Sequence, residues 1–515
     1  MNGAESLIRT AAAAGVEVCF ANPGTTEMPL VAALDAADGI RAVLGLFEGV
    51  CTGAADGYAR MSGKPALTLL HLGPGFANGI ANLHNARRAR SPVVNLIGDH
   101  ATWHAAADAP LASDIHSLAR PVSGWIRSVQ SAKAAARDTA EAIAAAGAFP
   151  GQIATLIVPS DCQWDPAHGP AQPAPLVWPP KVGDAAVKQA AEALGGAGPG
   201  AGLLLGAAAL SERGLSVVAR IAAKTQCRLI CETFPARVER GAGMPALERL
   251  PYFPEQAIEA LTPLQTIVLA GARSPVAFFG YPKMPSSLVP EGRKVVALAE
   301  HSDDALAALE ALAEAIGAPR AVSLPKKATR PGRPSGKLNA ASVGAALAAF
   351  IPENAIVMDE AATTGLPFFA ASSSAPRHSY LALTGGAIGQ GLPCATGAAV
   401  ACPDRRVIAF QADGSGMYTQ QSFWTQAREQ LNVTTLLCNN HSYRILQVEL
   451  ARAGVTEPGR KARSLTELSN PDIDWTRLAR SMGIPGVRVE DAESLCKELE
   501  GALATPGPSI IELML

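Results

Sequence analysis

The sequence predicts an α/β protein with three doubly wound, parallel-sheet domains, and three observations support this class. The first is length, because 515 residues exceed the usual size of one or two domains. The second is composition: apolar residues make up 48% and aromatic residues only 5%, which favours closely packed helices on parallel sheets. The third is a repeated alternation of short apolar runs with segments of helix length.

The first predicted domain covers residues 1–162 and shows this alternation clearly. Turns follow two of its apolar runs, at Asn22–Gly24 and at His71–Gly75, and Thr25 or Thr26 can cap the helix after the first turn. The predicted strands are Val16–Ala21, Arg41–Phe47, Ala66–Leu70 and Pro92–Ile97, and the predicted helices are Gly49–Met61 and Ala77–Ala89.

The second predicted domain covers residues 182–324 and follows a proline-rich stretch, Trp164–Lys181. Its glycine-rich run Gly196–Gly202 precedes a strand, whereas a dinucleotide fingerprint follows a strand and opens a helix. We therefore interpret this run as a linker and expect neither NAD nor FAD there. The predicted strands are Gly202–Gly206, Arg228–Cys231, Thr266–Ala270 and Val295–Ala299.

The third predicted domain covers residues 338–515 and follows a basic, proline-rich linker, Pro325–Lys337. The predicted strands are Ala355–Met358, Val407–Phe410, Thr434–Cys438 and Ser509–Leu513, with a crossover helix at Tyr418–Gln430.

Charge and composition exclude several classes of partner. The formal charge is −2 and no basic run stands out, so we expect no nucleic acid. The first residues lack a basic segment with a long apolar core, and no apolar run is long enough to span a bilayer, so we expect neither export nor a membrane. The nine cysteines are scattered, and Cys227 and Cys231 lack a second pair for zinc. We expect reduced thiols in a cytoplasmic protein.

Two polar residues follow neighbouring strands in Val407–Tyr443: Asp413 ends the first apolar run, and Asn440 follows the second. Because both strands of a βαβ unit run parallel, the two side chains are expected at one carboxyl edge, where open α/β sheets bind ligands. A carboxylate and an amide oxygen with a nearby carbonyl suit Mg²⁺ with a diphosphate as co-ligand. The alternative is an ordinary helix cap beside a surface turn.

This stretch resembles a known signature. Asp413-Gly414-Ser415 with the later Asn440 is similar to the cofactor motif of thiamine-diphosphate (ThDP)-dependent decarboxylases and synthases. The resemblance implies that Asp413, Asn440 and the Ser442 carbonyl hold Mg²⁺. It also places Gly414, Ser415 and Tyr443 at the cofactor. Ala412 departs from the pattern, because the family usually has a glycine there.

Glu48 follows an apolar strand, and the run Glu48–Arg60 resembles the family pattern E-x-x-A-x-x-A-A-D-G-Y-A-R. The resemblance implies that Glu48 hydrogen-bonds a pyrimidine nitrogen of ThDP and so takes part in catalysis. The alternative is a glutamate in the first turn of a helix, where the helix dipole favours it.

Two further turns carry the resemblance. Asn22–Glu27 resembles the N-P-G-S/T-x-E turn of benzoylformate decarboxylase, which implies Thr25 facing the substrate carboxylate, with Pro23 and Gly24 at the cofactor. His71 matches one of the two catalytic imidazoles of that group, whereas the Gly-Pro-Gly after it, followed by Asn78 at the cofactor, looks more like acetolactate synthase. The alternative for His71 is a structural hydrogen-bonder.

The run Thr384–Pro393 resembles the loop under the cofactor. The resemblance gives the Gly386 carbonyl to the aminopyrimidine and makes Ile388 the apolar wedge that bends ThDP. Thr363, at a helix start after a strand, would suit a diphosphate oxygen. A glycine-rich helix-packing segment is the alternative for the run.

The second imidazole of benzoylformate decarboxylase is expected near Pro275–Tyr281 and is missing, since Phe278, Phe279 and Gly280 stand there. Phe278, Phe279 and Leu446, with Thr25 and His71, are the expected substrate pocket. His116 and His441 could substitute as proton donors, but surface or capping roles suit both better.

The resulting hypothesis is a ThDP- and Mg²⁺-dependent 2-oxo acid decarboxylase or carboligase, acting through an enamine on the cofactor and similar to benzoylformate decarboxylase. The resemblance implies a homodimer or homotetramer with active sites at the subunit interface. One alternative is an acetolactate synthase without an evident FAD site. The other is a catalytically retired structural subunit of the same fold.

Overall fold

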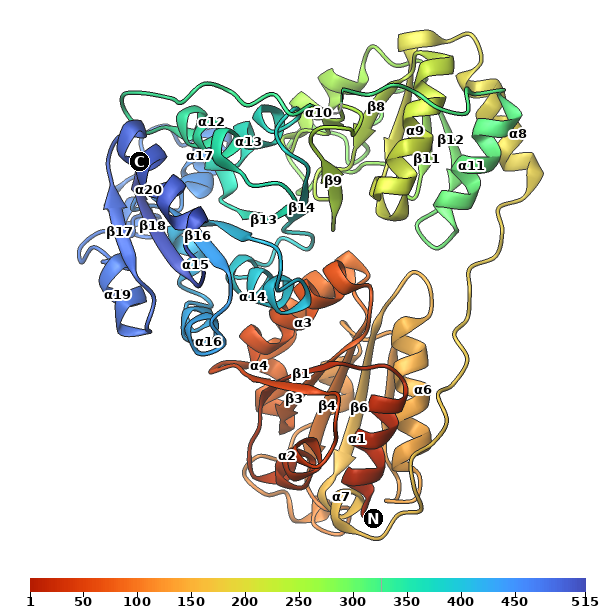
Figure 1. Ribbon diagram of the computed structural model, residues 1–515, viewed down its shortest axis with the longest axis vertical. Helices are drawn as coiled ribbons and strands as arrows, with labels where there is room; N and C mark the ends of the chain where they lie inside the picture. Colours follow the sequence, from red (N-terminus) through yellow and green to blue (C-terminus); the bar gives the residue numbers. More distant parts are fainter. Residues whose placement is uncertain (326) are drawn as a thin grey trace.

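Three sheets of mostly parallel strands, each covered by helices, form three lobes of the chain (Figure 1). The computed structural model describes residues 1–325 and 327–515. The predicted α/β class is confirmed, whereas the three domain boundaries stay predictions. Part of the predicted linker Pro325–Lys337, residue 326, lies outside the described residues.

The first sheet has the order β2-β1-β3-β4-β6-β5, and all its neighbouring strands are parallel. Its strands are β1 Val18–Asn22, β2 Arg41–Leu44, β3 Ala66–His71, β4 Val93–Asp99, β5 Trp125–Ser128 and β6 Ile153–Pro159. Helices α1 Gly3–Ala13, α2 Met28–Asp35 and α6 Ala135–Gly147 contribute to one apolar core. Helices α3 Glu48–Ser62, α4 Leu72–Ala89 and α5 Ile115–Ala119 contribute to a second, and α7 Ser160–Trp164 follows β6. The sheet is therefore covered on both faces, as a doubly wound fold requires.

The second sheet has the order β10-β8-β7-β11-β12 and is also parallel. Its strands are β7 Ala201–Leu205, β8 Arg228–Cys231, β10 Glu248–Arg249, β11 Thr266–Ala270 and β12 Lys294–Ala299. Its helices are α8 Asp184–Leu194, α9 Glu212–Thr225, α10 Pro254–Leu261 and α11 Ala305–Ala315. The segment between α7 and α8 climbs along the outside of the molecule from the first lobe to this one (Figure 1).

The third sheet has the order β17-β18-β16-β15-β13-β14-β9. Its strands are β13 Ala355–Glu360, β14 His378–Ala382, β15 Val407–Ala412, β16 Val433–Asn439, β17 Gly486–Val489, β18 Ser509–Met514 and β9 Val238–Arg240. Its helices are α12 Ala340–Phe350, α13 Leu366–Ala371, α14 Gly391–Ala401, α15 Asp413–Gly416, α16 Ser422–Arg428, α17 Arg444–Arg452, α18 Arg460–Ser464, α19 Trp475–Ser481 and α20 Ala492–Ala504. Strand β9 is the exception to the parallel pattern: it comes from the chain of the second lobe and pairs antiparallel with β14.

Three predicted element bounds are wrong. Helix α4 begins at Leu72, so the turn predicted at His71–Gly75 is its first helical turn, where Pro74 is tolerated because the first amides have no helical acceptor. The strand predicted at Arg41–Phe47 ends at Leu44, and Glu48 is the first residue of α3 instead of following a strand directly. The predicted helix Tyr418–Gln430 shortens to α16, because the amides of Tyr418 and Thr419 bond three residues back, to Ser415 and Gly416, as in turns.

The first and third lobes meet where α3 lies against α14 (Figure 1). A Cβ atom at Gly57 would lie 1.9 Å from the Cys394 carbonyl oxygen, and one at Gly397 would lie 1.8 Å from that of Ala54. The two helices therefore touch backbone to backbone, which only glycine permits at these positions.

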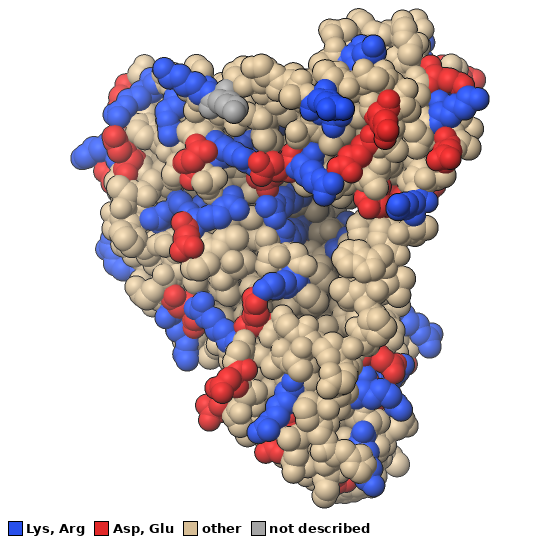
Figure 2. Space-filling view, turned by 45° about the vertical axis from the view of Figure 1, so that its right-hand side comes forward, with Lys and Arg blue, Asp and Glu red and all other residues tan. Residues whose placement is uncertain are grey.

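Charged residues of both signs are mixed on the face drawn in Figure 2, and a hollow opens where the lobes meet. Within residues 1–325 and 327–515, no helix is both long and apolar enough to cross a bilayer. All nine cysteines are free thiols, and burial raises the pKa of Cys19 to about 12.

Candidate functional site

Glu48 lies at the carboxyl edge of the first sheet as the first residue of α3, and it is only 8% exposed. Its Oε2 atom accepts a hydrogen bond of 3.0 Å from Nδ2 of Asn78 on α4. Its Oε1 atom faces Gly75, where a Cβ would lie 3.0 Å away. The side chain is thus held by one oxygen, while the other lies against a glycine that leaves space beside it.

His71 ends strand β3 and is anchored by a buried carboxylate. Its Nδ1 atom lies 2.8 Å from Oε2 of Glu27, which is fully buried, and 3.2 Å from the Thr26 hydroxyl. Glu27 also accepts bonds from the Gly24 amide at 2.8 Å and the Thr26 hydroxyl at 2.7 Å. A carboxylate only accepts, so Nδ1 of His71 carries the proton and Nε2 is left as the basic nitrogen.

Glycine packing explains this arrangement. A Cβ at Gly24 would lie 2.4 Å from the His71 ring, and one at Gly98 on β4 would lie 1.9 Å from Glu27 Oε1. Only residues without a side chain allow the imidazole and the carboxylate to lie so close to these strand ends. In the sequence, Glu27 is one residue of the turn Asn22–Glu27, and its place in the N-P-G-T-T-E run is the signal that points to it.

Asp413 and Asn440 meet at the carboxyl edge of the third sheet. Strands β15 and β16 are parallel with Ala412 opposite Cys438, so the residues that follow them emerge side by side. The Asn440 amide donates to Oδ2 of Asp413 at 3.1 Å, and the Gly414 amide donates to Oδ1 at 2.8 Å. Burial raises the pKa of Asp413, and the amide hydrogen bonds only partly oppose this shift.

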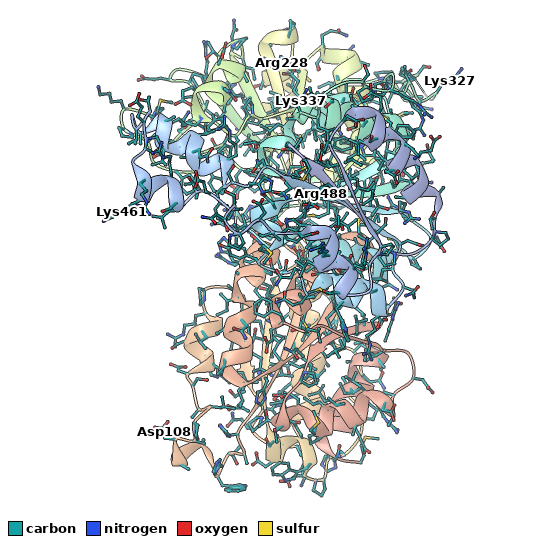
Figure 3. The ribbon with its side chains drawn as sticks, turned by 90° about the vertical axis from the view of Figure 1, so that its left-hand side faces the viewer. Asp108, Arg228, Lys327, Lys337, Lys461 and Arg488 are labelled. Atoms are coloured by element: carbon teal, nitrogen blue, oxygen red, sulfur yellow. The ribbon has the colours of Figure 1, made fainter. Side chains whose placement is uncertain are left out.

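The turn after β16 is supported from within the sheet. Oδ1 of Asn440 accepts bonds from the amide and the hydroxyl of Ser442, at 3.0 and 3.1 Å. Asn439 donates to the buried Glu512 at 2.7 Å, and Arg488, labelled in Figure 3, donates to the other oxygen of Glu512 at 3.0 Å. An ion pair at the sheet edge therefore fixes the strand end that presents Asn440.

The loop 384–391 connects β14 to α14, and the buried Glu360 at the end of β13 holds its second half. Oε1 of Glu360 accepts from the amides of Gly389 at 2.7 Å and Gln390 at 3.3 Å, and Oε2 accepts from the Gly391 amide at 2.6 Å. Ile388, the predicted wedge, directly precedes these amides and is half-buried. A fully buried carboxylate thus fixes the backbone beside it, although burial raises its pKa.

An aromatic group from the second lobe reaches this loop. A Cβ at Gly386 would lie 2.5 Å from the ring of Phe278, so glycine is needed for the ring to approach the loop. Phe279 packs edge-on against Phe278, with ring centroids 5.0 Å apart. The hydroxyl of Tyr281 donates to Glu449 on α17 at 3.1 Å, on the helix that also carries Leu446. Phe278, Phe279 and Leu446 are all partly exposed.

Other predicted residues lie apart from these clusters. Thr25 is exposed, and it is Thr26 that contacts His71. His116 bonds the Ser128 hydroxyl at 2.9 Å and lines a separate cavity of about 620 Å³ with Arg127. His441 forms an ion pair of 3.3 Å with Asp472. Thr363 is half-buried in a short 3₁₀ turn, Ala362–Thr364, after β13.

The residues present fit ThDP and Mg²⁺ in their chemistry. A Cβ at Gly414 would lie 2.3 Å from the Tyr443 ring, so the turn that would approach the diphosphate is necessarily glycine. A cavity of about 470 Å³ opens beside Asn440 and Ser442. In the part of the chain described, no group of three His, Cys, Asp or Glu side chains could hold a metal. A cation here would thus depend on Asp413 with amide and carbonyl oxygens, the donor set that Mg²⁺ accepts.

Comparison with known proteins agrees with this geometry. The family profile described as "Thiamine pyrophosphate enzyme, N-terminal TPP binding domain" matches residues 1–118. The corresponding C-terminal TPP binding domain profile matches residues 365–513. These ranges contain the Glu48 and His71 clusters and the Asp413 cluster, respectively.

Similar proteins extend over the whole chain. IlvX of Mycobacterium tuberculosis, provisionally named an acetolactate synthase large subunit, is 51% identical over 520 residues, covering 100% of this chain and 99% of that protein. Benzoylformate decarboxylase of Pseudomonas aeruginosa is 29% identical, with 97% and 96% covered. The solved structure of a Rhodococcus jostii ThDP-dependent 4-hydroxybenzoylformate decarboxylase matches with a TM-score of 0.87, 25% identity and coverage of 100% and 99%. These matches confirm the resemblance that the motifs predicted.

Proposed function

The chain belongs to the thiamine pyrophosphate enzyme family, and from this premise we propose that it decarboxylates a 2-oxo acid in the manner of benzoylformate decarboxylase. It is a ThDP-dependent enzyme related to benzoylformate decarboxylase and to acetolactate synthase. When bound, ThDP supplies the nucleophilic carbon and the electron sink for cleaving the bond beside a carbonyl.

One observation carries the proposal: Glu48 is buried, and within residues 1–325 and 327–515 only one of its oxygens has a side-chain donor. Oε1 would be the oxygen that holds or releases a proton beside the pyrimidine ring of bound ThDP, while Asn78 keeps Oε2 in place. In the loop 384–391, the Gly386 carbonyl would accept from the aminopyrimidine of ThDP and Ile388 would be the apolar wedge. Pro23 and Gly24 would contact the pyrimidine side of the cofactor.

Asp413, Asn440 and the Ser442 carbonyl would hold Mg²⁺, and Gly414, Ser415, Thr363 and Tyr443 would contact the diphosphate. Asp413 keeps lone pairs for a cation, since in the described part of the chain each of its oxygens accepts one amide hydrogen bond. At Asn440 Oδ1, a cation would replace the Ser442 hydroxyl.

His71 would handle protons beside the substrate. Glu27 holds its Nδ1–H, which leaves Nε2 to accept or donate a proton at the reacting carbonyl. Thr25, on the exposed side of the same turn, would meet the substrate carboxylate, and Phe278, Phe279 and Leu446 would face its side chain. These side chains favour a 2-oxo acid with an apolar substituent.

A homodimer or homotetramer with sites between subunits is part of the proposal. For the described residues, the side-chain hydrogen bonds of Glu48 end at Asn78, and those of Asp413 end within its own turn and at Asn440. These hydrogen bonds do not join the Glu48 cluster to the Asp413 cluster within one chain. This agrees with a dimer in which the Glu48 cluster of one copy faces the Asp413 cluster of another.

Acetolactate synthase activity is the second candidate, and the segment 275–281 favours it. Phe278 and Phe279 stand where the decarboxylase group has its second imidazole, so protonation of the product before release lacks a donor there. Without that donor, formation of a carbon–carbon bond with a second carbonyl compound would compete better with protonation and aldehyde release.

The test is CO₂ release from a panel of 2-oxo acids, including pyruvate and benzoylformate, with and without added ThDP and Mg²⁺. The same samples are assayed for free aldehyde and acetolactate. We expect cofactor-dependent CO₂ with aldehyde from an aromatic or branched acid. Acetolactate from pyruvate would establish the second candidate instead. No CO₂ from any acid, together with no ThDP binding, would contradict both.

A further inference from the structure

Asp56 and Arg60 form a buried ion pair on helix α3. Both residues lie in the run that follows Glu48, four positions apart on α3, and both side chains are buried, with 0% and 2% of their surface exposed. Asp56 accepts two hydrogen bonds from Arg60, at 2.8 Å from Nε and 2.7 Å from an Nη atom. Burial lowers the pKa of Arg60, but the charge of Asp56, the nearby Cys394 and the hydrogen bond to Asp56 together outweigh burial, so the net shift is upward.

Arg60 joins α3 of the first lobe to the edge of the third sheet. Its guanidinium donates to the Ala382 carbonyl at the end of β14 at 2.8 Å, and to the Thr384 hydroxyl at 2.9 Å. A longer bond of 3.4 Å reaches the Ala236 carbonyl, just before β9. The guanidinium therefore bonds both the strand end that precedes the loop 384–391 and Thr384, the first residue of the loop.

Asp56 reaches the other end of the same loop. Its Oδ2 atom accepts a hydrogen bond from Nε2 of Gln390, two residues after Ile388. The Gln390 amide meanwhile bonds Glu360, so its backbone and side chain are held by carboxylates from the third and the first lobe. The other side-chain atom of Gln390, Oε1, is buried and has no hydrogen-bond partner among the described residues.

We propose that Asp56, Arg60 and Gln390 are positioning residues that hold the wedge loop 384–391 in its cofactor-binding shape from the first lobe. This inference rests on the proposed function, because it assigns the loop to ThDP. The Asp56–Arg60 pair holds both ends of the loop, at Thr384 and at Gln390, so Ile388 between them has little freedom. A loop fixed before binding loses less conformational entropy when the cofactor enters.

A purely structural role would predict a different result. If the pair served only to hold α3 against the third lobe, removing one of its hydrogen bonds would lower stability and leave ThDP binding unchanged. Removing Asp56 itself would leave a buried, unpaired guanidinium and could prevent folding. The informative change is therefore at Gln390.

The test variant is Gln390→Met. Methionine keeps the length and volume of the side chain, removes the bond to Asp56 and leaves the Asp56–Arg60 pair intact. The matched control is Gln163→Met. Gln163 is also fully buried, donates one bond of 2.8 Å from Nε2 to the Val158 carbonyl, and has an unpartnered Oε1. Both variants remove one bond from a buried glutamine, but Gln163 lies in α7, remote from the loop in sequence and in the opposite part of the first lobe (Figure 1).

ThDP affinity is measured by calorimetric titration of the cofactor-free full-length protein, and kcat, KM and Tm are measured with the best 2-oxo acid. We expect Gln390→Met to raise the ThDP dissociation constant about tenfold and lower kcat about tenfold, as for the loss of one bond to a charged acceptor. The substrate KM should stay within about twofold. Both variants should lose a similar few degrees of Tm.

Gln390→Met with the ThDP affinity and kcat of Gln163→Met would overturn the inference and leave the proposed function standing. If wild-type protein itself failed to bind ThDP, the proposed function would fall, and the inference with it. If Gln390→Met did not fold, Thr384→Val would carry the same test at the other end of the loop, where it removes the bond from Arg60 and the bond from the Thr384 hydroxyl to the Asn85 carbonyl.

Discussion

At the carboxyl edges of both the first and the third sheet, a buried carboxylate opens a helix, but the hydrogen-bond donors that hold it differ. Glu48 opens α3 and Asp413 opens α15, and both carboxylates are buried, at 8% and 2% exposed. Asp413 is fixed by backbone, with one amide on each oxygen. Among the described residues, the side chain of Glu48 is held through Oε2, by the side chain of Asn78.

The difference separates two kinds of chemistry. A carboxylate whose two oxygens are fixed by backbone amides cannot turn, which suits a ligand for a cation of strict geometry. A carboxylate held by one oxygen keeps the other for a proton that must come and go. The fold supplies the same buried position at both edges, and the local donors decide what each one does.

The same contrast holds for two histidines. His71, at the end of β3, is partly exposed and bonded to Glu27. His378, at the start of β14, is fully buried, and its Nδ1–H donates to the Pro376 carbonyl at 2.7 Å. Its Nε2 has no partner among the described residues, and burial lowers its pKa to about 4. One imidazole is partly exposed beside a carboxylate, whereas burial keeps the other neutral.

The largest effect should come from Glu48→Gln, which preserves shape and removes the exchangeable proton. We expect turnover to fall by at least about 1000-fold, within the range for a general acid–base group, with ThDP binding retained. Steady-state CO₂ release and a ThDP titration measure the two quantities. Glu17→Gln, at an exposed glutamate paired with Lys64, is the control and should change turnover less than about twofold. Unchanged turnover in Glu48→Gln would contradict the role given to that carboxylate.

Asp413→Asn should weaken the binding of Mg²⁺. We expect Mg²⁺ affinity to fall by more than about 100-fold, because even partners outside the coordination shell cost up to about 100-fold in metal sites. Turnover measured against Mg²⁺ concentration should shift accordingly and partly recover at high Mg²⁺. Asp404→Asn, at an exposed residue before β15, should leave the Mg²⁺ curve in place. A curve that does not move in Asp413→Asn would remove Asp413 from the metal site.

The two inactive variants together test where the site is completed. If Glu48 of one chain serves the cofactor held by Asp413 of another, mixed dimers of Glu48→Gln and Asp413→Asn contain one intact site. Mixing the unfolded variants and refolding them should then restore activity that neither shows alone. Activity that stays absent, although mixed dimers form, would place both carboxylates of a site in the same chain.

The smallest effect at neutral pH should be that of His378→Asn, whose amide can still donate to Pro376. A histidine with a lowered folded pKa stabilises the fold above its unfolded pKa of 6.5, and this stability is lost as pH falls toward about 4. Between these values the wild type should lose about 3 kcal/mol more free energy of unfolding than the variant. Denaturant unfolding at pH 7.5 and at pH 4 measures it. Equal losses in both proteins would show that His378 is not kept neutral by the fold.

The sequence by itself determined the features that follow from local pattern. Apolar runs between helix-length segments predicted the parallel sheets, and the strand ends predicted that Asp413 and Asn440 would lie together. This worked because parallel strands of one βαβ unit bring their carboxyl ends to one edge, whatever surrounds them. The family motifs directed attention to Glu48, His71 and the loop 384–391 as candidate site residues.

The tertiary structure alone decided which distant groups support that site. Asp56 and Gln390 are 334 positions apart, Glu360 meets amides about 30 positions later, and β9 leaves the second lobe to pair with β14. It also set Thr26, rather than Thr25, beside His71. Periodicity specifies elements and turns, but contacts between lobes depend on how helices pack. Here that packing is set by the glycines that let α3 and α14 touch.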